Sequence, residues 1–364
     1  IDESYVSFEN TYARINDKSI VKSILADNNI HKYLYNAKLL MHFFETSDFK
    51  NFDDIYLAYH LITGGARKPD IDRIIYEYFG VGWDVKPLYY KKIADDLRLR
   101  ISELSMTELY NDELEVSKVL YEMERNGIRV DSKEMKRILN EFEVEIEKIS
   151  KNFKEITNTD INLNSPKQIS DYLFKKLNLT LDDKHSSLYK LKTQKYSTTQ
   201  DVLNFLYPYA PKVISLILKH REYSRLKSFV EKMIECIKDD RIHTTYDQTS
   251  TATGRIASFN PNLQNIPVKT ESAKKIRRCF IADEGYFFVS FDYSQIDLRV
   301  LAHVSGDEKL VSSFINGEDI HIKTAKSLFA SQDITEDERR IAKTINFGII
   351  YGQTPLGLSV EAAI

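Results

Sequence analysis

The chain has 364 residues, of which 42% are hydrophobic and 29% are charged, and its formal net charge at pH 7 is −3. This length is more than one hydrophobic core ordinarily serves, so it predicts several domains, and no apolar run is long enough for a transmembrane helix. The slightly negative charge argues against a protein that coats nucleic acid through charge alone. Cys236 and Cys279 are too few for a disulfide framework or a zinc site, which fits a reducing cytoplasm.

Segments within the first 110 residues mix short apolar runs with Gly-rich turns, and this pattern predicts a small α/β unit. From about residue 110 to residue 238 the pattern becomes helical, and within 135–153 apolar residues recur three and four positions apart. Ser165 and Pro166 are of the types that open a helix as N-cap and first helical residue. We expect that helix to continue to about Leu177.

The most β-prone segment of the chain is 286–291, Tyr-Phe-Phe-Val-Ser-Phe. Its alternation predicts a buried strand that ends at Asp292, followed by a helix from Gln295 to Ser305 that Gly306 terminates. A carboxylate at such a junction is a good ligand for a hard cation such as Mg²⁺. By itself, however, an Asp in this position is more often a helix cap.

The sequence that follows Asp292 favours a metal ligand over a helix cap. Residues 292–303, DYSQIDLRVLAH, resemble the first catalytic motif of the family A DNA polymerases, which are the DNA polymerase I-like enzymes. The resemblance implies that Asp292 ligates both catalytic Mg²⁺ ions, that the backbone beside Tyr293 meets the metal and the incoming triphosphate, and that Gln295 lies at the nucleotide. Two such ions, held about 4 Å apart by shared carboxylates, activate the primer hydroxyl and hold the leaving pyrophosphate.

One residue of this motif departs from the family pattern. Asp297 stands where the family usually has Glu, whose longer side chain crowds the ribose 2′ position. The resemblance therefore predicts that this protein excludes ribonucleotides less strongly than its relatives with Glu do.

A second signature is residues 339–352, RRIAKTINFGIIYG, which resemble the nucleotide-binding helix of the family's fingers domain. Two cations and then two aromatic residues follow one another four positions apart, so on one helix they lie along a face of about 18 Å. A nucleoside triphosphate on that face would meet charge at its phosphates and flat apolar surface at its sugar and base. The four residues are Arg339, Lys343, Phe347 and Tyr351.

The family resemblance assigns each of these residues a role. It implies that Lys343 binds the phosphates and donates a proton to the departing pyrophosphate, and that Arg339 grips the outer phosphate. Phe347 would stack near the sugar and reject dideoxynucleotides, while Tyr351 would gate the insertion site. His321 is expected near the triphosphate, although a purely structural histidine is nearly as consistent with its position between the motifs.

Further matches concern the DNA duplex. Residues 251–258 and 261–267 resemble the palm segment that reads the minor groove, where every correct base pair presents acceptors in similar positions. In the helical section, 164–168 and 225–228 resemble the parts of the thumb that hold the duplex by its phosphates. The expected DNA-binding residues are Arg255, Asn262, Gln264, Asn265, Lys269 (where many relatives have Arg), Arg277, Asn164, Ser165, Lys167, Lys227 and Ser228.

The N-terminal segment weakly resembles the later part of the family's ribonuclease H-like 3′–5′ exonuclease domain. Two positions that carry metal ligands in active relatives hold Leu40 and, in an uncertain register, Ala94 with Asp95 beside it. Asp53 alone remains in a plausible place. Because a two-metal site needs several carboxylates, we expect no proofreading.

The chain also lacks the family's His-Asp-Glu string, whose Asp is the second bridge between the metal ions. Both ends look cut, and we expect a chain truncated after the fingers motif, inactive by itself. The predicted fold is a multidomain α/β (α+β) protein. Its parts are a degenerate exonuclease-like domain (1–110), the thumb (111–240), the first part of the palm (241–305) and the start of the fingers (306–364).

The predicted function of the parent protein is DNA-directed DNA synthesis in replication or repair, with two Mg²⁺ ions, dNTPs and primer-template DNA. We expect a monomer that has no membrane role and works in the cytoplasm at the nucleoid. Two alternatives stay open: a catalytically inactive DNA-binding or scaffolding relative, and a single-subunit RNA polymerase-like enzyme.

Overall fold

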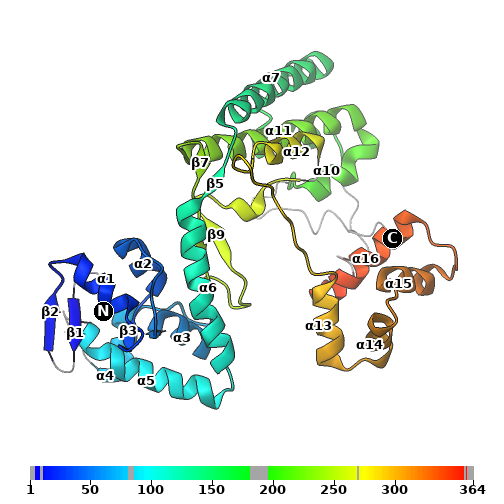
Figure 1. Ribbon diagram of the computed structural model, residues 1–364. Coiled ribbons are helices and arrows are strands. Elements are labelled where there is room, and N and C mark those ends of the chain that lie inside the picture. Colours follow the sequence, from blue (N-terminus) through cyan, green and yellow to red (C-terminus); the bar gives the residue numbers. More distant parts are fainter. Residues whose placement is uncertain are drawn as a thin grey trace. The chain divides into compact units, whose positions relative to one another are not determined.

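The structure is a computed structural model that describes residues 5–8, 11–80, 86–180, 196–268, 270–355 and 358. It confirms the predicted mixture of helix and sheet in more than one domain (Figure 1). The contacts divide the chain into two compact units, Ile1–Phe288 and Val289–Ile364. The finer division into exonuclease-like, thumb, palm and fingers parts stays a prediction.

The N-terminal part of the first unit is a small α/β body, as predicted. Strands β1 (Tyr5–Phe8) and β2 (Thr11–Arg14) form an antiparallel hairpin, and β3 (Lys32–Leu34) pairs in parallel with β4 (Phe52–Asp54). A single hydrophobic core joins these strands to the surrounding helices. The helices are α1 (Lys18–Ala26), α2 (Ala37–Phe44), α3 (Ile55–Ile62), α4 (Ile71–Phe79) and α5 (Pro87–Glu103).

The middle of the chain is helical, again as predicted. Helix α6 (Thr107–Asn126) leads from the α/β body, and α7 (Ser132–Thr157) packs along α11 (Pro211–Glu235) (Figure 1). Ser165 caps α8 (Pro166–Ser170), and the helix continues through a π-helical stretch, η1 (Asp171–Lys176), which confirms the predicted start and length. Helix α10 (Gln200–Leu206) and the 3₁₀ turn η2 (Tyr207–Tyr209) complete this part.

Short strands close the first unit. Strands β5 (Ile128–Arg129), β7 (Arg241–Ile242) and β6 (Ile237–Lys238) form one antiparallel sheet in that order, and β8 (Thr245–Asp247) pairs with β9 (Ala257–Phe259). The 3₁₀ turn η3 (Leu263–Asn265) and helix α12 (Glu271–Arg278) follow. Buried residues of α12 share a hydrophobic core with α7 and α11.

The predicted buried strand at 286–291 is wrong in this structure. These residues form no strand, and Phe287 and Phe291 are 90% and 91% exposed. A strand needs a hydrogen-bonded neighbour, and none of the described strands pairs with this segment. A high β propensity is therefore not sufficient, and Asp292 follows an exposed irregular segment.

The second unit contains α13 (Ile296–Ser305), α14 (Glu308–Ile315), α15 (Ile320–Phe329) and α16 (Glu336–Ile350). Gly306 ends α13 in the left-handed conformation, as predicted. Helices α15 and α16 pack against each other, and α14 contacts both α13 and α15.

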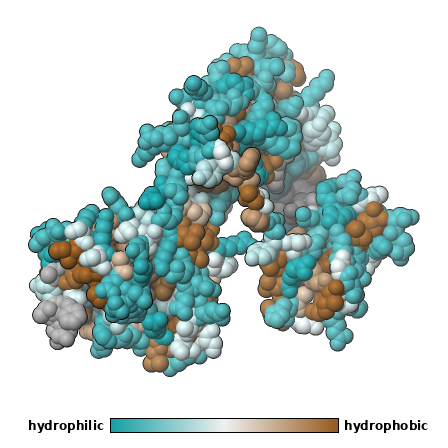
Figure 2. Space-filling view, in the orientation of Figure 1, coloured by the Kyte–Doolittle hydropathy of each residue, from teal (hydrophilic) through white to brown (hydrophobic). Residues whose placement is uncertain are grey.

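The face of the molecule drawn in Figure 2 is mainly hydrophilic. Figure 2 shows one face on which hydrophobic residues form only scattered patches in each unit. Within the described ranges, no helix is long and apolar enough to span a bilayer.

Candidate functional site

Helix α16 carries the four residues that the spacing placed on one face. A capping box starts it: the Thr335 side chain accepts from the Glu338 amide, and the Glu338 carboxylate accepts from the Thr335 amide. Arg339, Lys343 and Phe347 lie inside the helix, and Tyr351 is its C-cap. The prediction that one helix presents these side chains is therefore confirmed.

The aromatic end of this face is ordered by stacking. The rings of Phe347 and Tyr351 lie nearly parallel, with centroids 6.3 Å apart and an interplanar angle of 15°. The His321 ring, from α15, also lies next to Phe347, with a centroid distance of 5.8 Å. The rings of Phe347 and Tyr351 offer flat apolar surface next to the cationic half of the helix.

The first cation of the face, Arg339, has a protein partner. Its Nε and Nη2 donate to Oδ2 of Asp319 over 3.1 and 2.8 Å. The other oxygen of Asp319 caps α15 by accepting from the amides of His321 and Ile322. Partial burial raises the pKa of Asp319, but the hydrogen bonds from Arg339 and from these amides outweigh it, so the pKa is lowered and the carboxylate stays charged.

The second cation, Lys343, is exposed and makes no hydrogen bond or ion pair with the described residues. An ammonium group without a partner is free to bind an anion. The two cations of this face therefore differ: Lys343 is available at once, whereas Arg339 must first leave Asp319.

His321 is buried, being 2% exposed. Its Nδ1 accepts a 3.0 Å hydrogen bond from the Asn346 amide nitrogen. Burial lowers the pKa of His321, the nearby Arg339 and Lys343 charges lower it further, and Asp319 opposes them. His321 is therefore a neutral imidazole beside the cationic end of α16.

The structure connects Tyr351 to Asp297. The Tyr351 hydroxyl donates to Oδ2 of Asp297, in the first turn of α13, over 2.6 Å. Gln295 precedes this turn in the left-handed conformation, with a φ of 54°. Asp292 and Tyr293 are both exposed, and no hydrogen bond or ion pair joins their side chains to the rest of the described chain.

The expected minor-groove residues lie on and around the β8–β9 hairpin and η3. The side chain of Gln264 is hydrogen-bonded within this loop: its Oε1 accepts from the Ser258 amide, and its Nε2 donates to the Ile256 carbonyl. The Asn262 side chain caps the Gln264 amide. These two side chains hold the loop in shape, whereas three expected DNA-binding residues are exposed, and their side chains make no hydrogen bond or ion pair with the described residues: Arg255, Asn265 and Arg277. Lys269 lies outside the described residues.

Some of the expected thumb residues line a cavity, and others are already held by protein partners. Asn164 and Lys167, with Arg221 of α11, line a cavity of about 710 Å³ at the start of α8. Ser165 is occupied as the N-cap of that helix. Lys227 pairs with Glu143 at 3.0 Å and with Glu231 at 3.5 Å, and Ser228 is exposed beside it.

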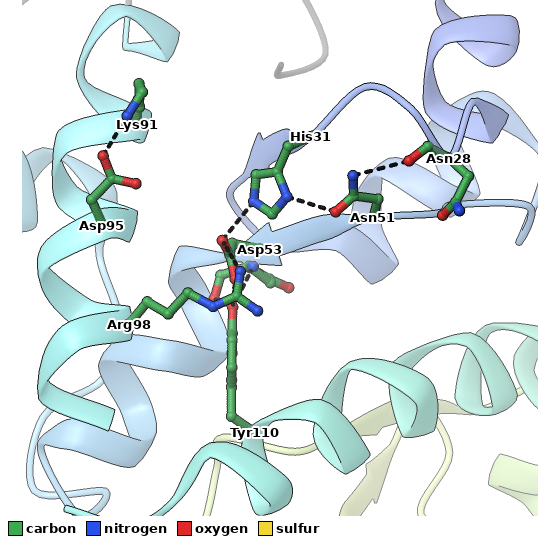
Figure 3. A network of polar contacts seen from close by, with 9 residues as sticks. Asn28, His31, Asn51, Asp53, Lys91, Asp95, Arg98 and Tyr110 are labelled. Atoms are coloured by element: carbon green, nitrogen blue, oxygen red, sulfur yellow. Dashed lines mark hydrogen bonds and ion pairs between the residues drawn. The ribbon is translucent and has the colours of Figure 1, made fainter. Parts of the chain in front are cut away.

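In the N-terminal body, Asp53 is almost fully buried and is held by protein groups (Figure 3). Its Oδ2 contacts Nε2 of His31 at 2.8 Å and Nη1 of Arg98 at 3.2 Å, and its Oδ1 accepts from the Tyr110 hydroxyl at 3.3 Å. Burial and the neighbouring Asp53 charge raise the pKa of Tyr110, which keeps the hydroxyl protonated as a donor. Both carboxylate oxygens are therefore engaged.

The neighbouring positions supply no further ligands. Leu40 and Ala94 are buried apolar residues, and Asp95 is exposed and pairs with Lys91 (Figure 3). Throughout the described ranges, no group of three or more His, Cys, Asp or Glu side chains could hold a metal ion. The residues around Asp53 therefore do not fit a two-metal site.

Sequence reasoning missed the partners of these residues. Asp319 was readable as a helix N-cap, because it precedes α15, but nothing in the sequence pairs it with Arg339. Nothing in the sequence indicated that Asp53 contacts His31, Arg98 and Tyr110, since these residues come from different parts of the N-terminal body.

The fold of the chain is that of a polymerase domain. A solved structure described as the "POL domain of Pol1 from M. smegmatis complex with DNA primer-template and dNTP" aligns with a TM-score of 0.84 at 31% identity. The alignment covers 96% of this chain and 64% of that one. More particularly, the chain belongs to DNA polymerase family A, because the sequence model of that family matches residues 132–364.

Curated relatives agree with this assignment. The chain is 34% identical to "DNA polymerase I" of Caldicellulosiruptor bescii over 99% of its own length and 43% of that protein. It is 43% identical to "DNA polymerase I" of Borreliella burgdorferi, over 76% of the chain and 29% of that protein. "DNA polymerase I, thermostable" of Thermus filiformis is 37% identical over 86% of the chain and 37% of that protein. The chain thus spans less than half of each of these relatives.

Proposed function

We propose that this chain carries the nucleotide-binding helix and part of the catalytic site of a DNA-directed DNA polymerase. Such an enzyme adds dNTPs to a primer 3′-hydroxyl as a template directs and releases pyrophosphate. The observation that carries the proposal is the face of α16, where an unpaired Lys343 is followed by the stacked rings of Phe347 and Tyr351, in a member of DNA polymerase family A. We propose replication or repair at the nucleoid as its setting, and a monomer as its form.

The phosphates of the nucleotide would bind at the cationic half of α16. Lys343 is free to contact them, and Arg339 would exchange the Asp319 carboxylate for a phosphate. This exchange conserves charge-assisted hydrogen bonds, because a phosphate offers acceptors to the guanidinium fork as a carboxylate does. The sugar and base would lie against Phe347 and Tyr351, next to Asp297.

Asp292 would supply a ligand to Mg²⁺. In proteins this ion binds through one or two carboxylates and completes its shell with water and substrate phosphates, so an exposed carboxylate without a partner fits it. When bound, the ions would activate the primer hydroxyl and stabilise the pyrophosphate. The family's His-Asp-Glu string, with the second shared carboxylate, is absent from these 364 residues, so we expect them to extend no primer by themselves.

The DNA duplex would be held by residues from two parts of the first unit. Arg255, Asn265 and Arg277 have side chains free for the minor groove and its flanking phosphates. The cavity beside Asn164 and Lys167 would receive a backbone phosphate. Such contacts would make DNA binding weaken steeply with salt.

The N-terminal body would contribute no proofreading. A 3′–5′ exonuclease of this kind needs metal ions, and the carboxylate of Asp53 is taken up by Arg98, His31 and Tyr110. By the family resemblance, Leu40 and, in an uncertain register, Ala94 occupy positions of metal ligands, and both are buried in an apolar core.

Primer extension by the protein as its natural gene encodes it tests the function. We expect Lys343→Ala to lower kcat/KM for a dNTP about 100-fold, because a charge-assisted contact to phosphate is lost. The matched control is Lys326→Ala, an exposed lysine of α15 in the same unit, which should extend normally.

Other results would favour the alternatives. No extension by the unaltered protein would favour an inactive DNA-binding relative, and preferential use of ribonucleotides would favour an RNA polymerase-like enzyme. Undiminished extension by Asp292→Ala would refute the catalytic assignment altogether.

A further inference from the structure

The loop that carries Arg255 is supported by the N-terminal body. This loop, residues 248–255, follows β8, and we call it the Arg255 loop. Its first two side chains are buried. Nε2 of Gln248 donates to the Glu113 carbonyl over 3.0 Å, and the hydroxyls of Thr249 and Tyr56 are hydrogen-bonded over 2.7 Å. Because these partners lie on α6 and α3, whose buried residues belong to the core of the N-terminal body, the start of the loop is fixed to a packed part of the protein.

At Gly65 the backbone of the N-terminal body touches the loop. Gly65 has a φ of 70°, and a Cβ placed on it would lie 2.5 Å from Cα and 3.0 Å from Cβ of Ala252. Atoms of a packed interior do not approach so closely, so a side chain at position 65 must push Ala252 away. The neighbouring Gly64 has a φ of 55°, but a Cβ placed there would meet no atom within 4 Å. The two glycines therefore share the left-handed conformation and differ in their contact with the loop.

Within the loop, the residues around Ala252 are joined to Arg255. The Thr251 hydroxyl donates to the Arg255 carbonyl over 2.7 Å. The Arg255 side chain is exposed and makes no hydrogen bond or ion pair with the described residues. The backbone of Arg255 is thus held in place, while its guanidinium is left for a partner.

Strand β8, from which the loop starts, is held by the same body. Oε1 of Glu124, on α6, accepts from the Tyr246 amide over 2.7 Å, and Nζ of Lys38, on α2, donates to the Tyr246 carbonyl. Glu124 is buried, and Lys38 forms an ion pair with it. The loop and the strand before it therefore share one support.

We propose that Tyr56 and Gly65 are positioning residues that hold the Arg255 loop in the place from which Arg255 contacts the minor groove of the DNA duplex. A loop held in its bound conformation loses less conformational freedom when DNA binds. The DNA part of this proposal rests on the proposed function, whereas the support of the loop by the body stands by itself. The N-terminal body would thereby serve duplex binding, although its residues do not fit a two-metal site.

Binding of a fluorescein-labelled primer-template tests the proposal on the protein as its natural gene encodes it. Fluorescence anisotropy at one salt concentration gives the Kd. We expect Arg255→Ala to raise the Kd about tenfold, because a groove contact is lost. Gly65→Ala should raise it about fivefold, because the methyl group displaces Ala252, and Tyr56→Phe about threefold, because Thr249 loses its partner.

A double-mutant cycle distinguishes positioning from general damage. If Gly65 acts through Arg255, Gly65→Ala should change the Kd less than about twofold in a protein that already carries Arg255→Ala. A merely structural loss would weaken binding equally with and without the Arg255 side chain. Additive effects of the two substitutions would therefore overturn the proposal.

Two matched controls accompany these variants. Gly64→Ala forces the same left-handed conformation on an alanine without a contact to the loop. Tyr59→Phe removes another hydroxyl of α3, one that contacts Glu77 and Arg73 of α4. Both should keep the Kd within about twofold of that of the unaltered protein. Circular dichroism identifies a variant that fails to fold, and if Gly65→Ala does so, Tyr56→Phe takes its place in the cycle.

Trypsin tests the support of the loop without DNA. Cleavage after Arg255 requires local opening of the loop, so its rate follows the population of the open form. We expect the fragment that ends at Arg255 to appear about fivefold faster from Gly65→Ala and from Tyr56→Phe than from the unaltered protein. The two control variants should be cleaved there at the unaltered rate.

The outcomes separate this proposal from the proposed function. If Arg255→Ala weakens binding but folded Gly65→Ala and Tyr56→Phe do not, the positioning role falls while the proposed function stands. Cleavage after Arg255 at an unaltered rate in both variants would likewise overturn the support of the loop. If the unaltered protein binds no primer-template, the proposed function falls, and the cleavage rates alone decide whether the body holds the loop.

Discussion

The hydroxyl of Tyr351 donates a 2.6 Å hydrogen bond to Oδ2 of Asp297. This contact joins the C-cap of α16 to the first turn of α13, so the residue proposed to gate the insertion site and the residue proposed to exclude the ribose 2′-hydroxyl restrain each other. An Asp side chain is one methylene shorter than Glu. The Asp297 carboxylate reaches the Tyr351 hydroxyl and is held at the end of α16.

We predict that Tyr351→Phe lowers the free energy of unfolding of the second unit by about 1 kcal/mol, the usual worth of one hydrogen bond. Denaturant unfolding, followed with a probe in that unit, measures the change. Tyr293→Phe is the control, since Tyr293 is 80% exposed and its hydroxyl has no hydrogen-bond partner in the described chain. Equal losses in the two variants would mean that the contact with Asp297 contributes nothing.

Asp297→Glu should strengthen the rejection of ribonucleotides. The longer side chain would extend further and leave less room for a 2′-hydroxyl, a steric effect of about 1–3 kcal/mol, or roughly 10-fold to 100-fold in selectivity. Single-nucleotide incorporation by the protein as its natural gene encodes it, with matched dNTP and rNTP, gives the ratio of kcat/KM. An unchanged ratio would show that Asp297 does not face the ribose.

Asp53→Ala should destabilise the first unit by about 1–3 kcal/mol, because it leaves the buried Tyr110 hydroxyl without this acceptor, whereas Arg98 and His31 are exposed enough to be hydrated. The control is Asp95→Ala, which breaks an exposed ion pair with Lys91 and should cost at most about 1 kcal/mol. Thermal unfolding measures both.

The same experiment asks whether Asp53 binds metal. A bound ion would raise the unfolding midpoint of the unaltered chain. We expect no rise with Mg²⁺ or Mn²⁺ in the unfolding midpoint of the first unit, which contains Asp53. A rise that Asp53→Ala abolishes, or trimming of a mispaired primer in the presence of Mg²⁺, would restore an exonuclease role.

Asp54 predicts a pH dependence of stability. Burial raises the pKa of this carboxyl to about 6, against the opposing effect of the Ala37, Tyr56 and Asn36 amides that it accepts from. Between the unfolded value of 3.8 and about 6, the folded chain holds more protons at this site than the unfolded chain. The contribution of Asp54 to stability therefore falls as pH rises through this window, by up to about 3 kcal/mol.

Unfolding free energies of the unaltered chain and of Asp54→Asn at pH 4 and pH 6 test this. The difference between the two proteins should shrink as pH rises, since only the unaltered chain must ionise a buried group. Asp70→Asn, at the exposed N-cap of α4, controls for the loss of a capping carboxylate. A difference that grows with pH would contradict the sign.

Much of the second unit could be predicted from local sequence. The box Thr335-x-x-Glu338 marks the start of α16, Gly306 marks the end of α13, and both signals act within a few residues of the backbone they control. The same holds for Ser165 and Pro166 at α8. The side chains along one face of α16 follow from helical geometry alone, which is why their spacing was informative.

The strand predicted at 286–291 failed for the opposite reason. Its aromatic and β-branched residues favour extended backbone, but a strand exists only when another strand supplies its hydrogen bonds, and that partner is not a property of the segment. The local preference indicated only that this segment could adopt an extended backbone. The described chain offers it no neighbour.

The sequence by itself determined the family, through its ordered motifs, and the positions of the helices that carry Arg339, Lys343 and Phe347. Only the tertiary structure decided which polar groups meet: Asp319 with Arg339, Asn346 with His321, Tyr351 with Asp297, and Asp53 with Arg98. Those pairs join residues 20, 25, 54 and 45 positions apart. Hydrogen-bonding groups of the same kind occur throughout the chain, so chemistry alone leaves their pairing open, and the packing of helices brings one partner rather than another within 3 Å or so.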